Sequence, residues 1–95
     1  DLPKVEIYTR RFCGYCTMAK RLLERHGIPY VEHDATGDAA IRAEMIQRSG
    51  GAFTFPQIFV GQHHVGGCRE LYAWESHGGL ERLAVGLLKE PEGKA

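Results

Sequence analysis

The stretch VEIYTRRFCGYCTMAKRLLER occupies residues 5–25. Its first part, Val5 to Thr9, alternates apolar and polar side chains and predicts a β-strand. After two cysteines separated by two residues, apolar side chains recur at helical spacing and predict a helix that ends near His26 and Gly27. The cysteine pair is therefore expected where a strand passes directly into a helix.

Periodicity and glycine signals predict six further elements after residue 27. The first two are a strand at 30–34 and a helix around Ile41, Met45 and Ile46, for which Thr36 and Asp38 are candidate caps. A strand at 57–60 follows, and a turn at 61–64 leads into a short returning strand from Val65. The last two are a helix from about residue 68 and a helix with Leu80, Leu83, Ala84, Leu87 and Leu88 on one face. The predicted order is β-α-β-α-β-β-α-α, an α/β fold with one mixed four-stranded sheet flanked by helices.

The composition describes one small globular domain. The chain has 95 residues, 43% of them hydrophobic, and 12 basic residues balance 12 acidic ones. We expect a single domain over residues 1–95. The balanced charge gives no reason to expect nucleic acid as a partner, and no apolar stretch approaches the roughly 18 residues of a membrane span. With no signal-peptide core near the first residues, a cytoplasmic location is the default expectation. We also expect a monomer.

The three cysteines, Cys13, Cys16 and Cys68, are too few and odd in number for a secreted disulfide scaffold, which favours a reducing compartment. The close pair is compatible with half a metal site, a structural bridge or a reactive dithiol. A zinc site completed by His63, His64 and Cys68 is disfavoured, because about 47 residues of patterned sequence separate the two halves.

Position alone makes the two paired thiols different. Cys13 is expected at the helix start, where free backbone N–H groups, the helix dipole and the charges of Arg10 and Arg11 favour a negative sulfur. Cys16 lies one turn further along, on the side of Ala19, and is expected to be more buried and more protonated. This asymmetry favours a reactive dithiol.

Three segments occur in order: YTRRFCGYC at 8–16, TFPQIFV at 54–60 and HHVGGCREL at 63–71. Together they resemble the glutaredoxin family, dithiol class, over about residues 4–88, with 89–95 as a frayed tail. The resemblance implies a thioredoxin fold and an enzyme, a glutathione-dependent thiol–disulfide oxidoreductase that reduces protein disulfides and protein–glutathione mixed disulfides. Electrons from the glutathione pool would then serve cell redox homeostasis.

The resemblance also implies residue roles. Cys13 becomes the nucleophile, Cys16 the resolving thiol and Pro56 a cis proline. Glutathione is expected along the backbone of Phe55, with its γ-glutamyl carboxylate at the N–H groups of a helix start and its glycyl carboxylate at Arg10. The implied glutathione-binding residues are Arg10, Tyr15, Thr54, Phe55, Pro56, Gly67, Cys68 and Arg69.

The chain departs from the family pattern at three positions. Arg69 replaces an acidic residue that meets the γ-glutamyl ammonium, so that contact falls to Glu70, to backbone, or is missing. Phe53 replaces a cationic or hydroxyl residue, and Gly14 replaces a proline. Relatives with a small residue at the proline position sometimes bridge a [2Fe-2S] cluster between two subunits through the first active-site thiol and glutathione. An iron–sulfur carrier or sensor that uses Cys13 in this way is therefore the alternative function.

The remaining candidates have simpler interpretations. Cys68 is expected as a small buried residue beside the groove. Tyr72 and Trp74 are expected in the core. His63 and His64 are interpreted as a solvated hairpin tip, and His33 and His77 as surface residues.

Overall fold

The computed structural model describes residues 3–86. Leu87, Leu88 and the tail expected at 89–95 lie outside these residues. The described part contains four strands, β1 (Val5–Thr9), β2 (Val31–Asp34), β3 (Gln57–Val60) and β4 (His63–Gly66). They form one sheet in the order β2-β1-β3-β4, in which β1 is parallel to β2 and antiparallel to β3, and β3 and β4 form a hairpin. The predicted mixed sheet is confirmed.

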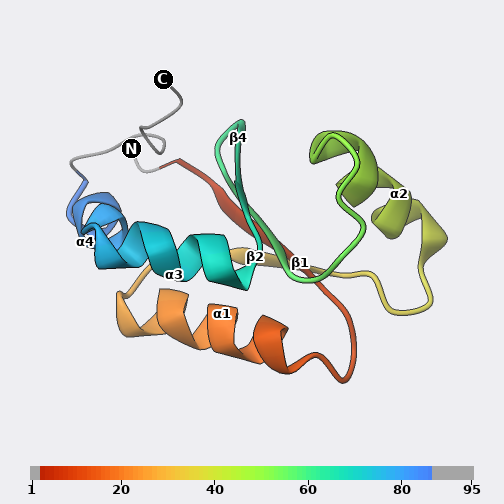
Figure 1. Ribbon diagram of the computed structural model, residues 1–95, viewed down its shortest axis with the longest axis horizontal. Coiled ribbons are helices and arrows are strands. Elements are labelled where there is room, and N and C mark those ends of the chain that lie inside the picture. The colour runs from red at the N-terminus through yellow and green to blue at the C-terminus, as the bar shows by residue number, and fades with distance from the viewer. Residues whose placement is uncertain (1–2, 87–95) are drawn as a thin grey trace.

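Four helices cover the two faces of this sheet (Figure 1). Helix α2 (Ala39–Arg48) lies on one face, and α1 (Gly14–Arg25), α3 (Cys68–Ser76) and α4 (Gly79–Ala84) lie on the other. The element order is the predicted one, and this arrangement is the thioredoxin fold. No helix among residues 3–86 is long and apolar enough to cross a membrane.

The buried side chains form two clusters, one on each face of the sheet. Because side chains alternate along a strand, Ile7 of β1 faces the larger cluster and its neighbour Tyr8 faces the smaller one, beneath α2. The larger cluster includes Val5, Ile7, Leu22, Leu23, Ile58, Val60, Leu71, Leu80 and Leu83, and the smaller one consists of Tyr8, Met45 and Phe59.

Local signals placed the starts of α2 and α3 and the end of α1, whereas the last helix was expected to include Leu87 and Leu88 and α4 ends at Ala84. Asp38 caps α2, where its side chain accepts the backbone N–H groups of Ala40 and Ile41, each at 3.1 Å. Thr36, the other candidate cap, instead accepts the backbone N–H of Arg11 at 2.7 Å. Its hydroxyl therefore fixes the loop after β1.

The hairpin tip differs from its prediction. The turn consists of Gly61 and Gln62 alone, and His63 and His64 belong to β4. The His64 ring stacks on Phe59, with ring centroids 4.8 Å apart, because the two residues are paired across the strands. The interpretation of His63 and His64 as a solvated tip is therefore wrong.

A charged cluster joins α2 to the sheet. Arg48 donates from one guanidinium nitrogen to Glu6 (3.1 Å) and to the Tyr8 hydroxyl (2.9 Å), and from the other nitrogen to the second Glu6 oxygen (3.3 Å). The Tyr8 hydroxyl donates to Glu44 at 3.1 Å, and His33 Nε2 lies 2.9 Å from Glu6. His33, expected as an unengaged surface residue, is thus part of a half-buried network.

Candidate active site

The cysteine pair lies at the junction of β1 and α1. Cys13 is the N-cap residue of α1, and its sulfur accepts the backbone N–H of Cys16 at 3.1 Å. The two residues form a disulfide, with Cα atoms 5.2 Å apart. Cys16 is only 2% exposed, whereas Cys13 is partly accessible. The predicted asymmetry in burial and in access to helix N–H groups is confirmed.

The loop before Cys13 is held by its own arginine. Arg10 donates from one guanidinium nitrogen to the carbonyl oxygens of Arg11 (3.0 Å) and Phe12 (3.2 Å). Phe12 has a φ of 57°, in the left-handed region that side-chain-bearing residues rarely adopt. The active-site turn therefore has a defined shape that local sequence preference does not favour.

The segment before β3 faces the cysteine loop. The Phe55–Pro56 bond is cis, as the resemblance implied. The Gln57 side-chain amide donates to the carbonyl oxygen of Thr54 (3.0 Å) and to its hydroxyl (3.2 Å). Because the amide nitrogen is used there, the Gln57 oxygen faces His64 and accepts its Nε2–H at 2.6 Å. This chain of hydrogen bonds fixes the backbone immediately before Phe55.

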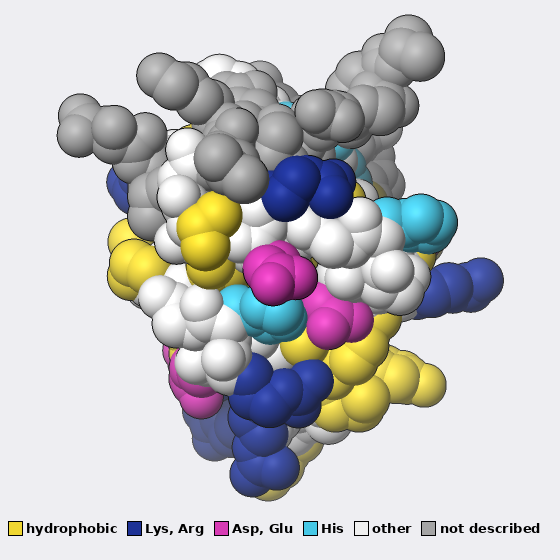
Figure 2. Space-filling model, turned by 90° about the vertical axis from the view of Figure 1, so that its left-hand side faces the viewer, with side chains coloured by type: hydrophobic (Ala, Val, Ile, Leu, Met, Phe, Trp, Pro, Cys, Tyr) yellow, Lys and Arg dark blue, Asp and Glu magenta, His cyan; other side chains and the backbone are white. Residues whose placement is uncertain are grey.

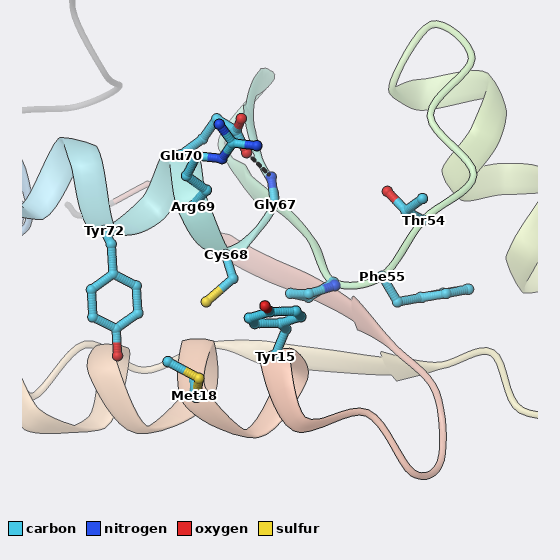
Figure 3. A pocket seen from close by; sticks show the side chains of 10 residues that line it. Tyr15, Met18, Thr54, Phe55, Gly67, Cys68, Arg69, Glu70 and Tyr72 are labelled. Carbon is cyan, nitrogen blue, oxygen red and sulfur yellow. Dashed lines mark hydrogen bonds between the residues drawn. The ribbon is translucent and has the colours of Figure 1, made fainter.

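A groove of about 600 Å³ runs between the start of α1, the cis-proline segment and the start of α3 (Figure 3). It contains most of the predicted glutathione-binding residues: Tyr15, Thr54, Phe55, Pro56, Gly67, Cys68 and Arg69. Met18, Glu70 and Tyr72 line it as well. Sequence reasoning expected Tyr72 in the core; its ring packs against the core on one side and borders the groove on the other.

The start of α3 closes one end of the groove. The backbone N–H of Gly67 donates to the Glu70 carboxylate at 2.9 Å, the dashed line in Figure 3. Gly66 has a φ of 125°, and a Cβ there would lie 2.8 Å from Glu70 Cγ. Glycine is therefore required at residue 66 for both conformation and space. Glu70 engages this helix cap, a role that sequence reasoning did not assign to it.

Arg10 does not line this groove. It lies instead in a second pocket of about 390 Å³, which we call the arginine pocket and which contains Arg10, Arg11, Phe12, Thr36, Arg42 and Phe55. Phe55 lines both cavities, so they meet at the cis-proline segment. Arg42 of α2 was not singled out from sequence because it lies 29 positions after Cys13 on a separate helix.

The glutaredoxin family model matches residues 5–65. The chain belongs to the glutaredoxin family. It is 49% identical to glutaredoxin 3 of Escherichia coli K12 over 82 residues, covering 86% of this chain and 98% of that protein. The glutaredoxin of Brucella melitensis, known from a solution structure, is 51% identical to this chain, and the two structures match with a TM-score of 0.74. The match covers 92% of this chain and 95% of the Brucella chain. The glutaredoxin in a crystal structure of a buckwheat glutaredoxin–glutathione complex is 25% identical to this chain, with a TM-score of 0.77. That match covers 94% of this chain and 83% of the buckwheat chain.

This glutaredoxin is a thiol–disulfide oxidoreductase, and the Cys13–Cys16 pair is its redox-active dithiol. The third cysteine is not part of that disulfide. Cys68 is a free thiol, 8% exposed, at the start of α3, and burial, followed by the nearby charge of Glu70, raises its pKa. The expectation of a small buried residue at position 68 is confirmed.

The zinc alternative for this glutaredoxin has no donor set in the part of the chain that the structure describes. Across residues 3–86, no three His, Cys, Asp or Glu side chains are grouped as a metal site requires. His64, one of the ligands considered, is instead occupied by Gln57 and Phe59. Burial, with the neighbouring charge of His63, lowers the pKa of His64, which favours its neutral form near pH 7.

Proposed function

We propose that this glutaredoxin reduces protein–glutathione mixed disulfides and protein disulfides, with glutathione as co-substrate. The observation that carries the proposal is the partly exposed residue Cys13 at a helix N-terminus, with a groove of about 600 Å³ beside the neighbouring Tyr15. The structural relative described as a glutaredoxin–glutathione complex supports glutathione as the small ligand.

Cys13 acts as the nucleophile. In the reduced enzyme the Cys16 N–H that reaches the Cys13 sulfur favours the thiolate. This thiolate attacks the glutathione sulfur of a mixed disulfide; the old S–S bond breaks, and the protein thiolate leaves and takes up a proton. A second glutathione thiolate then attacks the glutathione sulfur bound to Cys13, which releases oxidised glutathione and restores the Cys13 thiolate.

Cys16 acts as the resolving thiol for protein disulfides. After Cys13 has formed a mixed disulfide with the substrate protein, the Cys16 thiolate attacks the Cys13 sulfur and the second substrate thiol is released. The product is the Cys13–Cys16 disulfide, the state that this structure has. Two glutathione molecules return the enzyme to its dithiol form and supply the two electrons. The burial of Cys16 leaves Cys13 as the thiol that substrates reach first.

Glutathione is assigned to the groove in an extended conformation. Its γ-glutamyl carboxylate meets the N–H groups of Cys68 and Arg69 at the start of α3, a helix that runs to Ser76. Its cysteinyl part pairs with the backbone of Phe55, next to Thr54, Pro56 and Gly67, while Tyr15 covers the groove. Its glycyl carboxylate points past Phe55 to Arg10 in the adjoining arginine pocket.

The γ-glutamyl ammonium is the group of glutathione with the fewest suitable partners in the groove. Arg69 is cationic, and the Glu70 carboxylate already accepts the Gly67 N–H. We therefore expect glutathione to bind mainly through its carboxylates and its backbone.

A coupled assay with a glutathione mixed disulfide tests the mechanism, with wild type and both single cysteine variants. Cys13→Ser is expected to lose all activity. Cys16→Ser is expected to keep deglutathionylation and to lose the reduction of a protein disulfide. An active Cys13→Ser enzyme would contradict the assigned nucleophile, and an inactive Cys16→Ser enzyme in the deglutathionylation assay would contradict the single-thiol route.

The iron–sulfur alternative, a homodimer with a [2Fe-2S] cluster held by Cys13 and glutathione, stays a prediction, as do the monomeric state and the cytoplasmic location. Anaerobic reconstitution with iron, sulfide and glutathione, followed by a visible spectrum and a size measurement, tests the cluster and the oligomeric state together. A colourless monomer would remove the carrier function.

A further inference from the structure

Gln57 is a buried polar residue whose side-chain amide is fully engaged. It is the first residue of β3, it is 4% exposed, and its side chain lies with those of Tyr8 and Phe59 on the α2 side of the sheet. Its amide nitrogen donates to both oxygens of Thr54, and its oxygen accepts from His64 at 2.6 Å. An amide at so buried a position needs these partners, because an unpaired one carries the full cost of lost hydration.

The segment that Gln57 holds has few other attachments. Within residues 3–86, the two bonds from Gln57 to Thr54 are the only hydrogen bonds that residues 53–56 make. Ser49 anchors the preceding loop only as far as Ala52, through contacts of 2.9 and 3.2 Å. The direction of the Thr54 carbonyl is therefore set by the Gln57 side chain.

The direction of that carbonyl determines the direction of the next N–H. The Thr54–Phe55 peptide is trans, so its C=O and N–H groups point to opposite sides. Because the Thr54 oxygen is turned towards Gln57, the Phe55 N–H is turned away from Gln57. This N–H donates to no group within residues 3–86, and Phe55 lines the groove to which glutathione is assigned. Phe55 thus offers an unused donor with a fixed direction.

His64 determines which way round the Gln57 amide lies. The Thr54 carbonyl can only accept, so the NH₂ group of Gln57 faces it and the Gln57 oxygen faces His64, which donates from Nε2. The His64 ring is held in place by stacking on Phe59, with centroids 4.8 Å apart and an interplanar angle of 29°. Without a donor at this point, the amide would be free to rotate and to set its oxygen against the Thr54 carbonyl.

Other histidines make different contacts. Figure 2 shows the end of the molecule near α4, on the left of Figure 1, where histidine side chains lie at the surface among acidic and basic ones. His26 and His33 each contact a carboxylate, at 3.4 and 2.9 Å. His64 instead contacts a neutral amide, and burial lowers its pKa, which favours the neutral ring. Its hydrogen bonds lead to the groove and not to an ion pair.

We propose that Gln57 and His64 are positioning residues for glutathione. They do not touch the ligand. They direct the Phe55 N–H at the cysteinyl carbonyl of the tripeptide, so that the glutathione sulfur is presented to Cys13. The inference rests on the proposed function, which places the cysteinyl part of glutathione along Phe55. The contribution should appear with disulfides that contain glutathione and be absent with disulfides that do not.

Two small disulfides test this role with pre-reduced enzyme and no free glutathione. One is the cysteine–glutathione mixed disulfide, and the other is bis(2-hydroxyethyl) disulfide, which has no peptide group to pair with Phe55. The Cys13 thiolate attacks one sulfur of either disulfide and the other sulfur leaves as a thiol, so thiol release measures both reactions. The first second-order rate constant divided by the second is the glutathione preference. A change in Cys13 reactivity or in the amount of folded enzyme alters both rate constants and cancels in this ratio.

Two substitutions at residue 64 separate positioning from ring packing. In His64→Gln the side-chain nitrogen lies as many bonds from Cα as histidine Nε2 does, so it can donate to Gln57, but the stacking on Phe59 is lost. His64→Phe keeps a ring on Phe59 and has no donor. We expect His64→Gln to retain the wild-type glutathione preference and His64→Phe to lose about three- to tenfold of it, the effect of one hydrogen bond. A purely structural role of the ring would give the opposite order.

Gln57→Met removes both bonds to Thr54 and keeps a side chain of similar length at the buried position. It should lose at least as much glutathione preference as His64→Phe does. His63→Phe is the matched control, because it makes the same substitution on the other side of β4, at a residue outside both cavities. We expect it to keep the wild-type preference.

The outcomes distinguish this inference from the proposed function. A wild-type glutathione preference near one would contradict the placement of glutathione in the groove, and the inference would fail with it. A wild-type preference well above one that either His64→Phe or Gln57→Met retains would overturn the inference alone. A loss in His64→Gln as large as the loss in His64→Phe would do the same.

Discussion

Arg48→Met should destabilise the fold by about 2 kcal/mol at pH 7. The substitution removes the two contacts to Glu6 at 3.1 and 3.3 Å, the 2.9 Å hydrogen bond to Tyr8, and a guanidinium that lies 4.2 Å above the Phe59 ring. Breaking a fully buried ion pair costs about 3–5 kcal/mol. We take a lower value because the side chain of Arg48 is 27% exposed, His33 stays beside Glu6, and methionine keeps the apolar packing.

The loss should depend on pH. Burial acts to raise the pKa of Glu6, but hydrogen bonds from Arg48 and His33 outweigh it and hold the pKa below its usual 4.5. A carboxyl with a lowered folded pKa contributes stability above its unfolded pKa and loses it as the pH falls through the folded value. In Arg48→Met burial dominates and the pKa of Glu6 rises, so the difference between wild type and variant should be largest at pH 7 and should shrink at about pH 3.5.

Urea denaturation of the reduced protein measures this free energy of unfolding at both pH values. Arg42→Met is the matched control: it lies on the same helix, is exposed, and should change stability by less than about 0.5 kcal/mol. The double variant with Glu6→Gln should lose less than the sum of the single losses, because both changes break one pair. An Arg48→Met loss that equals the control, or that stays constant with pH, would refute the reasoning.

Two further predictions concern the residues around the groove. Gly14→Pro should raise the free energy of unfolding in urea by about 0.5–1 kcal/mol. Residue 14 is the first of α1, Cys13 before it is extended (φ −125°, ψ 100°), and no heavy atom lies within 4 Å of the position that a Cβ at residue 14 would take, so proline fits there. A loss of stability would show that the turn does not accept proline. Glu70→Ala should cost about 1 kcal/mol, because it leaves the Gly67 N–H without its 2.9 Å acceptor, whereas Glu70→Gln should keep most of the stability. Equal losses in the two Glu70 variants would mean that this hydrogen bond is not what stabilises the start of α3.

The sequence alone determined the elements and the reactive centre. The strand at Val5–Thr9, the cysteine pair at the start of α1, the cap at Asp38 and the strand at Gln57–Val60 were all predicted. These features depend on the alternation of apolar residues, on helical spacing and on side-chain hydrogen bonds between residues a few positions apart. They can therefore be predicted from residues that are close in the sequence. The proposed glutathione-binding residues followed from family motifs, and seven of the eight line one cavity.

Only the tertiary structure decided which distant side chains meet. Arg48 contacts Glu6 from 42 positions away, and no sequence pattern singled out this pair. Arg10 shares a pocket with Arg42 because α2 packs on the sheet near the active-site loop. The hydrogen bonds from His64 through Gln57 to Thr54 likewise depend on the pairing of β4 with β3. Short-range periodicity specifies the face that an element buries, but the partner of each side chain is set by the packing of elements that the sequence does not place next to one another.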